Sequence, residues 1–236
     1  MLNGLDLFTG IGGLTLGISE WVRPIAYCEI DPYCQGVILS RIGTNDLPNA
    51  PIWDDIKTFP IKYSKCIDII YAGFPCQDIS IAGIGKGLAG ERSSLCYDIF
   101  RIADEIKPRW IFLENVPAIT TRGGLDVVKE IAKMGYDCRW ITITASSVGA
   151  LHKRERWFLL AHARRERFIE GAEKIQSTRE KPIRKDFDEL CWGKDQSDMV
   201  RKGNGIPYQL DRIKSLGNSV VPIQAKTAFK ILMGII

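Results

Sequence analysis

The sequence predicts a doubly wound α/β domain, with a mixed, mostly parallel sheet covered by helices on both faces. Short apolar runs rich in strand-forming residues alternate with amphipathic stretches whose apolar residues recur at helical spacing. A glycine-rich turn joins the first apolar run to the first amphipathic stretch, and a glutamate follows the second run. Alternation of this kind is typical of βαβ units, in which a helix links neighbouring parallel strands.

Each expected element has the composition and spacing of its type. The expected strands are short apolar runs at Leu5–Phe8, Pro24–Cys28, Ile67–Gly73, Trp110–Leu113, Trp140–Thr144 and Trp157–Ala161. The expected helices are amphipathic stretches of good helix formers at Gly13–Trp21, Pro32–Ile42, Leu95–Ile106 and Leu125–Met134. The apolar stretch Pro222–Ile236 predicts a closing helix.

The 236 residues can bury one substantial core and at most a small second lobe. The regular pattern gives way to charged, polar sequence from about Arg164 to Gly205. We therefore expect a main domain over 1–163, a short variable segment over 164–205, and a closing segment over 206–236 that returns to the main domain. At about 40 residues, the variable segment is too short for much independent core.

The composition indicates a globular intracellular protein. Hydrophobic residues make up 45% of the chain and charged residues 25%, which is ordinary for a folded soluble domain. No run approaches the roughly 18 apolar residues of a membrane span, and the amino terminus lacks the pattern of a signal peptide, so we expect a cytoplasmic location. Seven cysteines without a CxxC pair, and only two histidines, predict reduced thiols and no structural metal.

Basic residues are concentrated between residues 152 and 185, although the formal net charge is only +4. A clustered basic patch favours binding to the phosphates of a nucleic acid. A solvated surface or loop is the alternative interpretation of the same cluster.

The segment Asp6–Gly13 ends a strand and opens a helix, where glycines permit a tight turn and close approach to a ligand. Glu29 follows the second apolar run, in the position of a carboxylate that accepts hydrogen bonds from a ribose diol. The loop has neither the GxxxxGK[ST] nor the GxGxxG spacing, so an adenosine without phosphates fits better than a nucleotide. Asp55 is placed to meet an adenine amino group, or serves as a turn or cap residue. A plain strand-to-helix turn remains the simpler interpretation of the loop.

One cysteine has a setting that suits chemistry. Cys76 lies in the sequence Gly-Phe-Pro-Cys-Gln, directly after an apolar run, and so on a loop at the carboxyl end of a strand. Open α/β sheets bind their ligands at this edge. The other cysteines are expected to be small buried hydrophobic residues: Cys28, Cys34, Cys66, Cys96, Cys138 and Cys191.

The chain resembles the DNA cytosine-5 methyltransferase family through six motifs in the family's order. They are Asp6–Gly13, Glu29, Gly73–Gln77, Leu113–Val116, Arg154–Arg156 and Gly217–Pro222. The resemblance implies a Rossmann-like class I S-adenosylmethionine-dependent methyltransferase fold, with S-adenosylmethionine converted to S-adenosylhomocysteine, no metal, and double-stranded DNA as the partner. The variable segment would then be an unusually short target-recognition region.

The resemblance also implies roles for individual residues. Cys76 would attack carbon 6 of a flipped-out cytosine, and Glu114, with a raised pKa, would donate to ring nitrogen 3. Arg154 and Arg156 project to one face and would contact the base and favour the thiolate. The implied cofactor-binding residues are Asp6, Phe8, Thr9, Gly10, Ile11, Gly12, Gly13, Glu29, Ile30, Asp55, Ile56, Pro75, Leu95, Asn218, Ser219 and Val220. The implied substrate contacts are Gln77, Ser80, Arg92 and Asn115, with the glycine-rich segment Ser80–Arg92 closing over the base.

Two features depart from the family's pattern and keep other interpretations open. Leu151 and His152 stand where members commonly have Pro-Gln, and the recognition segment is short. A related enzyme acting on transfer RNA, a catalytic subunit that needs a separate recognition chain, and a non-catalytic DNA-binding subunit are the alternatives. The sequence leaves open the target bases, the oligomeric state, and whether a cognate restriction endonuclease accompanies the chain.

Overall fold

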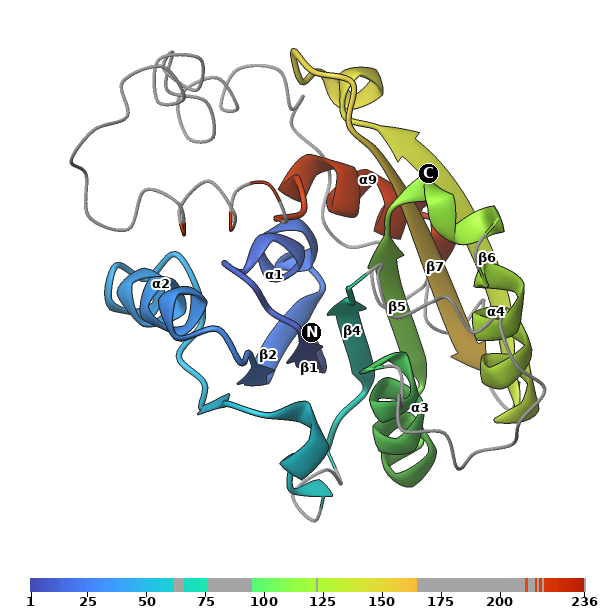
Figure 1. Cartoon of the computed structure of the whole chain (residues 1–236), viewed down its shortest axis with the longest axis horizontal. Coiled ribbons are helices and arrows are strands. Elements are labelled where there is room, and N and C mark those ends of the chain that lie inside the picture. Colours follow the sequence, from blue (N-terminus) through green and yellow to red (C-terminus); the bar gives the residue numbers. More distant parts are fainter. Residues whose placement is uncertain are drawn as a thin grey trace.

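The structure, a computed structural model, describes residues 1–61, 66–75, 95–121, 123–164, 211, 215, 217 and 219–235. Its strands form one sheet in the order β3-β2-β1-β4-β5-β7-β6 (Figure 1). The strands are β1 (Leu2–Leu7), β2 (Val22–Cys28), β3 (Ile52–Trp53), β4 (Ile69–Gly73), β5 (Trp110–Asn115), β6 (Tyr136–Thr144) and β7 (Glu155–Ala163). The helices are α1 (Gly13–Ile18), α2 (Pro32–Gly43), α3 (Leu95–Ile106), α4 (Gly124–Lys133) and α9 (Pro222–Met233). Single 3₁₀ turns are η1 (Ile56–Thr58), η4 (Pro117–Thr121) and η5 (Ser146–Val148).

The sheet is parallel from β3 to β5 and antiparallel at β7. β1 pairs in parallel with β2 and β4, β2 pairs with β3, and β4 pairs with β5. β7 runs antiparallel between β5 and β6. The carboxyl ends of β1 to β5 therefore meet at one edge of the sheet, and β7 begins at that same edge. The mixed, mostly parallel sheet confirms the expected fold class.

Two apolar cores cover the two faces of the sheet. Alternate side chains of each central strand point to opposite faces, as the two-residue period of a strand requires. Leu5 and Ile70 join the core beneath α3 and α4, whereas Ile69 and Tyr71 join the core beneath α1 and α9. Because β1, β4 and β5 are buried on both faces, they have the continuous apolar sequence of a parallel sheet.

The carboxy-terminal helix α9 lies beside α1 on one face of the sheet (Figure 1). Phe229 of α9 packs edge-on against Phe112 of β5 with ring centroids 5.2 Å apart, and against Trp21 at 5.5 Å. Lys226 also forms an ion pair with Glu20 just after α1. The far end of the sequence thus closes the core around the amino-terminal strand.

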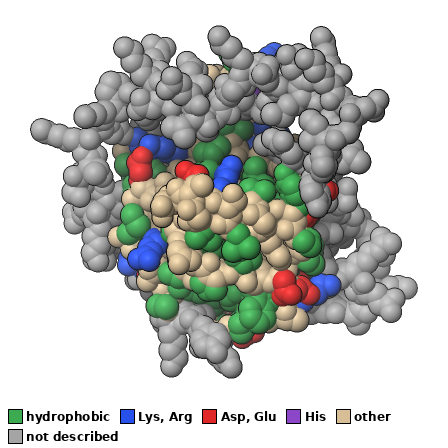
Figure 2. Space-filling view, turned by 90° about the vertical axis from the view of Figure 1, so that its left-hand side faces the viewer, with side chains coloured by type: hydrophobic (Ala, Val, Ile, Leu, Met, Phe, Trp, Pro, Cys, Tyr) green, Lys and Arg blue, Asp and Glu red, His purple; other side chains and the backbone are tan. Residues whose placement is uncertain are grey.

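Figure 2 looks onto the side of the molecule that carries α2, where apolar groups are interspersed with single charges. Within the described ranges, no helix has the length and apolar character needed to cross a bilayer. The same ranges contain no group of three His, Cys, Asp or Glu side chains arranged to hold a metal ion. The variable segment at 164–205 lies outside the described residues apart from Arg164.

The structure differs from the sequence-based elements at short or exposed positions. β3 was not expected, because two residues are too few to show a strand period. Phe8 falls outside β1, since its φ of 55° ends the strand. The run at Trp140–Thr144 is only the second half of β6, whose first half alternates poorly because β6 is an edge strand with Trp140 54% exposed. Helix α1 ends at Ile18 rather than Trp21, where the N–H of Trp21 donates to the Ile18 carbonyl and turns the chain into β2.

Candidate active site

The polar residues singled out in the sequence gather at the carboxyl edge of the sheet. Loops leave β1, β2 and β4 at this edge, and β7 enters there, because β5 and β7 are antiparallel neighbours. The pairing places Asn115, at the end of β5, opposite Trp157 near the start of β7. The described residues at this edge are Phe8–Gly13, Glu29, Asp55, Phe74, Pro75, Glu114, Asn115, Arg154 and Arg156.

The loop after β1 is held on the end of β2 by Glu29. The N–H of Gly10 donates to Glu29 Oε2 at 2.7 Å, and the N–H of Asp31 donates to Glu29 Oε1 at 2.8 Å. Gly10 and Gly12 have φ values of 56° and 88°, in the left-handed region that favours glycine. Glu29 is only 9% exposed, so two backbone donors fix the direction of its carboxylate.

Asp6 supports this loop from within the core. Its Oδ2 lies 2.6 Å from Thr15 Oγ1, which in turn lies 2.8 Å from the Tyr71 hydroxyl. Asp6 is fully buried, and its Oδ1 has no hydrogen-bond partner among the described residues. Burial raises the pKa of Asp6 well above its usual range, and the nearby charge of Glu29 raises it further. The side chain expected at the cofactor is therefore a neutral carboxyl beneath the glycine loop.

Close backbone packing joins the glycine loop to the carboxy-terminal segment. A Cβ on Gly13 would lie 2.5 Å from the Val220 carbonyl oxygen, so only glycine fits there. Gly73, at the end of β4, approaches both sides of the site in the same way. A Cβ at that position would meet Glu114 Oε2 at 3.0 Å and Val220 Cγ2 at 3.8 Å. The expected cofactor residues Gly13 and Val220 are thus brought together beside the carboxylate of Glu114.

Glu114 forms a buried ion pair with Arg156 at the end of β5. Arg156 Nε lies 2.8 Å from Glu114 Oε1, and the glutamate is 6% exposed. Burial raises the pKa of Glu114 to about 7, even though Arg156 and Arg154 favour its charged form. A carboxyl group with this pKa populates both protonation states near neutral pH, which suits proton donation to a bound base.

Asn115 ties the loop after β4 to the end of β5. Its Nδ2 donates to the Phe74 carbonyl at 3.0 Å, and its Oδ1 accepts from the N–H of Val116 at 2.8 Å. Asn115 is buried, so its contacts in the described residues are to backbone. Its amide therefore fixes the direction of the chain just before Pro75, the residue that precedes Cys76.

Arg154 differs from Arg156 in what it binds. Its Nη2 donates to the carbonyls of Gly217 and Ser219, each at 2.7 Å. Burial lowers the pKa of Arg154, and the positive charge of Arg156 lowers it further. Gln224 of α9 donates to the Arg154 carbonyl at 2.5 Å and to the Ile143 carbonyl at 3.0 Å. The side chain and backbone of Arg154 therefore both hold the carboxy-terminal segment to the start of β7.

Residues 2–202 match the sequence profile of the C-5 cytosine-specific DNA methylases. The chain belongs to this family. It is 33% identical over 237 residues to the Type II methyltransferase M.CviJI of Paramecium bursaria Chlorella virus IL3A, covering 95% of this chain and 58% of that protein. It is 34% identical over 165 residues to the Type II methyltransferase M.HhaI of Haemophilus parahaemolyticus, covering 67% and 48%. The chain spans about half the length of the curated relatives it matches.

The fold of this methylase-family chain also matches that of a solved structure. The crystal structure of a putative DNA modification methyltransferase encoded within an E. coli prophage superposes with a TM-score of 0.56 and 25% sequence identity. The match covers 70% of this chain and 47% of the other. The family resemblance is confirmed, and with it the Rossmann-like fold of class I S-adenosylmethionine-dependent methyltransferases.

Several expected site residues of the methylase-family chain have clear places. Thr9 is buried and its hydroxyl donates to the Asp6 carbonyl at 3.2 Å, so it shapes the loop. Ile30 is 68% exposed beside the carboxylate of Glu29, whereas Ile56 is buried. Leu95 packs at the border of the core at the start of α3. The expected residues that lie outside the described ranges are Cys76, Gln77, Ser80, Arg92 and Asn218.

Sequence reasoning missed four residues that position the site. Thr15 and Tyr71 complete the hydrogen-bond chain of Asp6, and Gln224 anchors the backbone of Arg154. Arg41 of α2 donates to the Ile11 carbonyl at 2.8 Å and so steadies the glycine loop. A lone threonine on a helix or a glutamine in an apolar helix was the available signal. Their partners are distant in sequence or backbone atoms, which residue spacing does not reveal.

Proposed function

We propose that this chain transfers a methyl group from S-adenosylmethionine to carbon 5 of a flipped-out cytosine in double-stranded DNA. The observation that carries the proposal is the buried Glu114–Arg156 pair at the carboxyl edge of the sheet, with the pKa of Glu114 near 7. This pair lies next to the loop that leads through Pro75 to Cys76. A buried glutamate whose pKa lies near the working pH is suited to general acid catalysis.

The residues at the ends of β1 to β3 suit an adenosine-containing cofactor. Glu29 has both oxygens fixed by backbone donors, and a carboxylate retains lone pairs for the hydroxyls of a ribose. Ile30 presents an exposed apolar side chain for the face of an adenine, and Asp55 stands at the end of the neighbouring strand. S-adenosylmethionine, when bound, supplies a methyl group carried on a positively charged sulfur.

The chemical roles of the chain's own side chains follow from the reactivity of cytosine. The thiolate of Cys76 adds to carbon 6, and the protonated Glu114 donates to nitrogen 3 as electron density moves through the ring to carbon 5. Once carbon 5 has been methylated, it loses its proton to solvent. The carbon–sulfur bond then breaks, Glu114 recovers its proton from nitrogen 3, and the aromatic ring and the free thiolate are restored.

Arg156 and Arg154 act differently in this proposal. Arg156 holds the Glu114 carboxyl in place and lowers its pKa against the effect of burial, so that the group can still give up its proton near neutral pH. Arg154 holds the Gly217–Ser219 backbone, and through Val220 it supports the glycine loop. The cytosine must leave the base stack to reach such a site, and we expect the segment Ser80–Arg92 to close over it.

A labelling experiment tests this function. The purified chain is incubated with methyl-labelled S-adenosylmethionine, with unmethylated or hemimethylated DNA in one reaction and total transfer RNA in another. We expect label in DNA as 5-methylcytosine and none in RNA. Label only in transfer RNA would replace DNA with RNA as the substrate. Cofactor binding without transfer, restored by adding the product of a neighbouring gene, would instead show a catalytic subunit that needs a recognition partner.

A further inference from the structure

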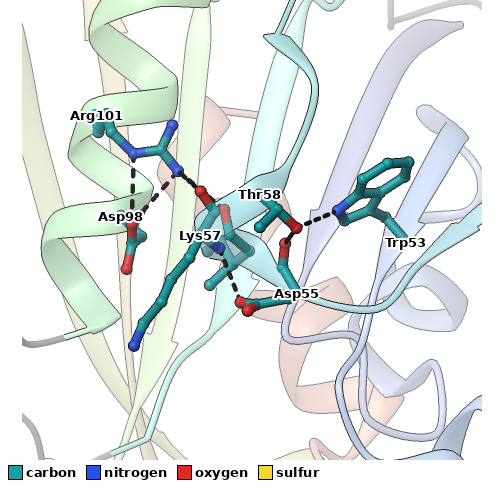
Figure 3. A network of polar contacts seen from close by, with 7 residues as sticks. Trp53, Asp55, Lys57, Thr58, Asp98 and Arg101 are labelled. Atoms are coloured by element: carbon teal, nitrogen blue, oxygen red, sulfur yellow. Dashed lines mark hydrogen bonds and ion pairs between the residues drawn. The ribbon is translucent and has the colours of Figure 1, made fainter.

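The turn after β3 is held at its amino-terminal end by side chains of its own segment (Figure 3). Asp55 Oδ1 accepts a hydrogen bond from the N–H of Lys57 at 2.9 Å, which caps the single turn η1. The Thr58 hydroxyl donates to the Asp55 carbonyl at 3.2 Å and accepts from Trp53 Nε1 at 3.1 Å. These contacts set the direction of the Asp55 carboxylate relative to β3.

Arg101 of α3 holds the other end of the same turn (Figure 3). Its Nη2 donates to the Ile56 carbonyl at 2.9 Å and to the Lys57 carbonyl at 3.4 Å. Carbonyls at the end of a helical turn lack partners within the turn, and the planar guanidinium can serve two of them at once. The buried side chain of Ile56 packs into the same core as Phe100 of α3. The turn is thus fixed to α3 by both polar and apolar contacts.

Asp98 orients the guanidinium of Arg101. Its Oδ1 lies 3.3 Å from both Nε and Nη2 of Arg101, one turn away on the same face of α3. The Asp98 side chain is largely buried, while Arg101 is partly exposed. This pair spends two of the five guanidinium donors on orientation and aims the remaining N–H of Nη2 at the carbonyls of η1.

We propose that Arg101, oriented by Asp98, is a positioning residue that gives the cofactor site its selectivity for adenine. This inference rests on the proposed function. Arg101 fixes η1, η1 fixes Asp55, and the Asp55 carboxylate accepts a hydrogen bond from the amino group of adenine. In hypoxanthine an oxo group replaces that amino group and would face the carboxylate as a second acceptor. Selectivity between these two bases therefore reports how firmly Asp55 is held.

Calorimetric titration of the full chain with two ligands tests the proposal. The ligands are S-adenosyl-L-homocysteine and its deaminated analogue S-inosyl-L-homocysteine. We expect the wild-type chain to prefer the adenosyl ligand by about tenfold or more, because a carboxylate left facing an acceptor loses a charge-assisted hydrogen bond. Arg101→Met retains the apolar stem but no donors. It should bind the adenosyl ligand about fivefold more weakly, with little change for the inosyl ligand.

Three further variants distinguish positioning from general damage. Arg101→Lys should recover part of the selectivity, because an ammonium group can still donate to a carbonyl, and Asp98→Asn should lose part of it. The matched control is Lys129→Met, which removes an equivalent pair with Asp126 on α4 and should bind both ligands like the wild type.

Equal weakening of both ligands in Arg101→Met, or an unchanged ratio of their affinities, would overturn the positioning role. Failure of the wild-type chain to bind either ligand would instead refute the proposed function, and this inference with it. Thermal unfolding of each variant shows whether it is folded at the titration temperature. If Arg101→Met is unfolded there, Arg101→Lys and Asp98→Asn decide the question by the same ratio.

Discussion

Replacing Glu114 with glutamine should remove a specific pH dependence from the stability of the chain. The pKa of this carboxyl is about 7 in the folded protein and 4.5 in an unfolded chain. Between these values the folded state binds more protons than the unfolded state, so stability is highest below the unfolded pKa and falls as pH rises toward 7. The separation corresponds to about 3 kcal/mol, with a steepest slope of about 1.4 kcal/mol per pH unit.

Urea unfolding at several pH values between 4.5 and 8 measures this effect. Arg156 stays charged across the range, so its loss of a partner in Glu114→Gln shifts stability by a constant amount. The difference between the wild type and Glu114→Gln should therefore change by about 3 kcal/mol across the range, with the wild type losing ground as pH rises. Glu130→Gln removes an exposed partner of Lys133 and serves as the control. Parallel pH profiles for the wild type and Glu114→Gln would refute the assignment of a raised pKa to Glu114.

Three further substitutions probe other parts of the site. Cys76→Ser should abolish methyl transfer while S-adenosylhomocysteine binding, measured by calorimetry, persists; substantial residual transfer would remove Cys76 as the nucleophile. Gly13→Ala should destabilise the chain by about 1–3 kcal/mol in urea unfolding, because the new methyl would clash with the Val220 carbonyl. Gly36→Ala is its control, since nothing lies within 4 Å of that Cβ, and equal effects would argue against the clash. Gln224→Leu should cost about 1–3 kcal/mol in the same assay by leaving the Ile143 carbonyl without its side-chain donor; an unchanged unfolding midpoint would show that this contact contributes nothing.

The sequence predicted the elements and the edge of the sheet that carries the site, because both follow from local patterns. The spacing from Gly10 to Glu29 marked two strand ends that become neighbours in a parallel sheet, and Glu29 does accept a hydrogen bond from Gly10. The two-residue strand β3 escaped prediction, because a period needs several repeats to be recognised.

Family motifs located residues more reliably than they indicated what the side chains touch. Asp6 was expected at the cofactor, but its side chain points into the core toward Thr15. Asn115 was expected at the substrate, yet its amide binds the Phe74 carbonyl. Arg154 was paired with Arg156 by spacing, although its partners are the carbonyls of residues more than sixty positions away. Such contacts depend on the approach of distant backbone, which residue types and spacing do not encode.

The central claim is that Cys76 and the Glu114–Arg156 pair methylate cytosine in DNA. The most direct test is to map 5-methylcytosine by sequencing the DNA of cells that express the wild-type chain or Cys76→Ser, in a host without cytosine-5 methylation of its own. The account predicts 5-methylcytosine in a defined sequence context with the wild type and none with Cys76→Ser. The same methylated positions with both chains, or labelled methyl groups recovered only in RNA, would contradict it.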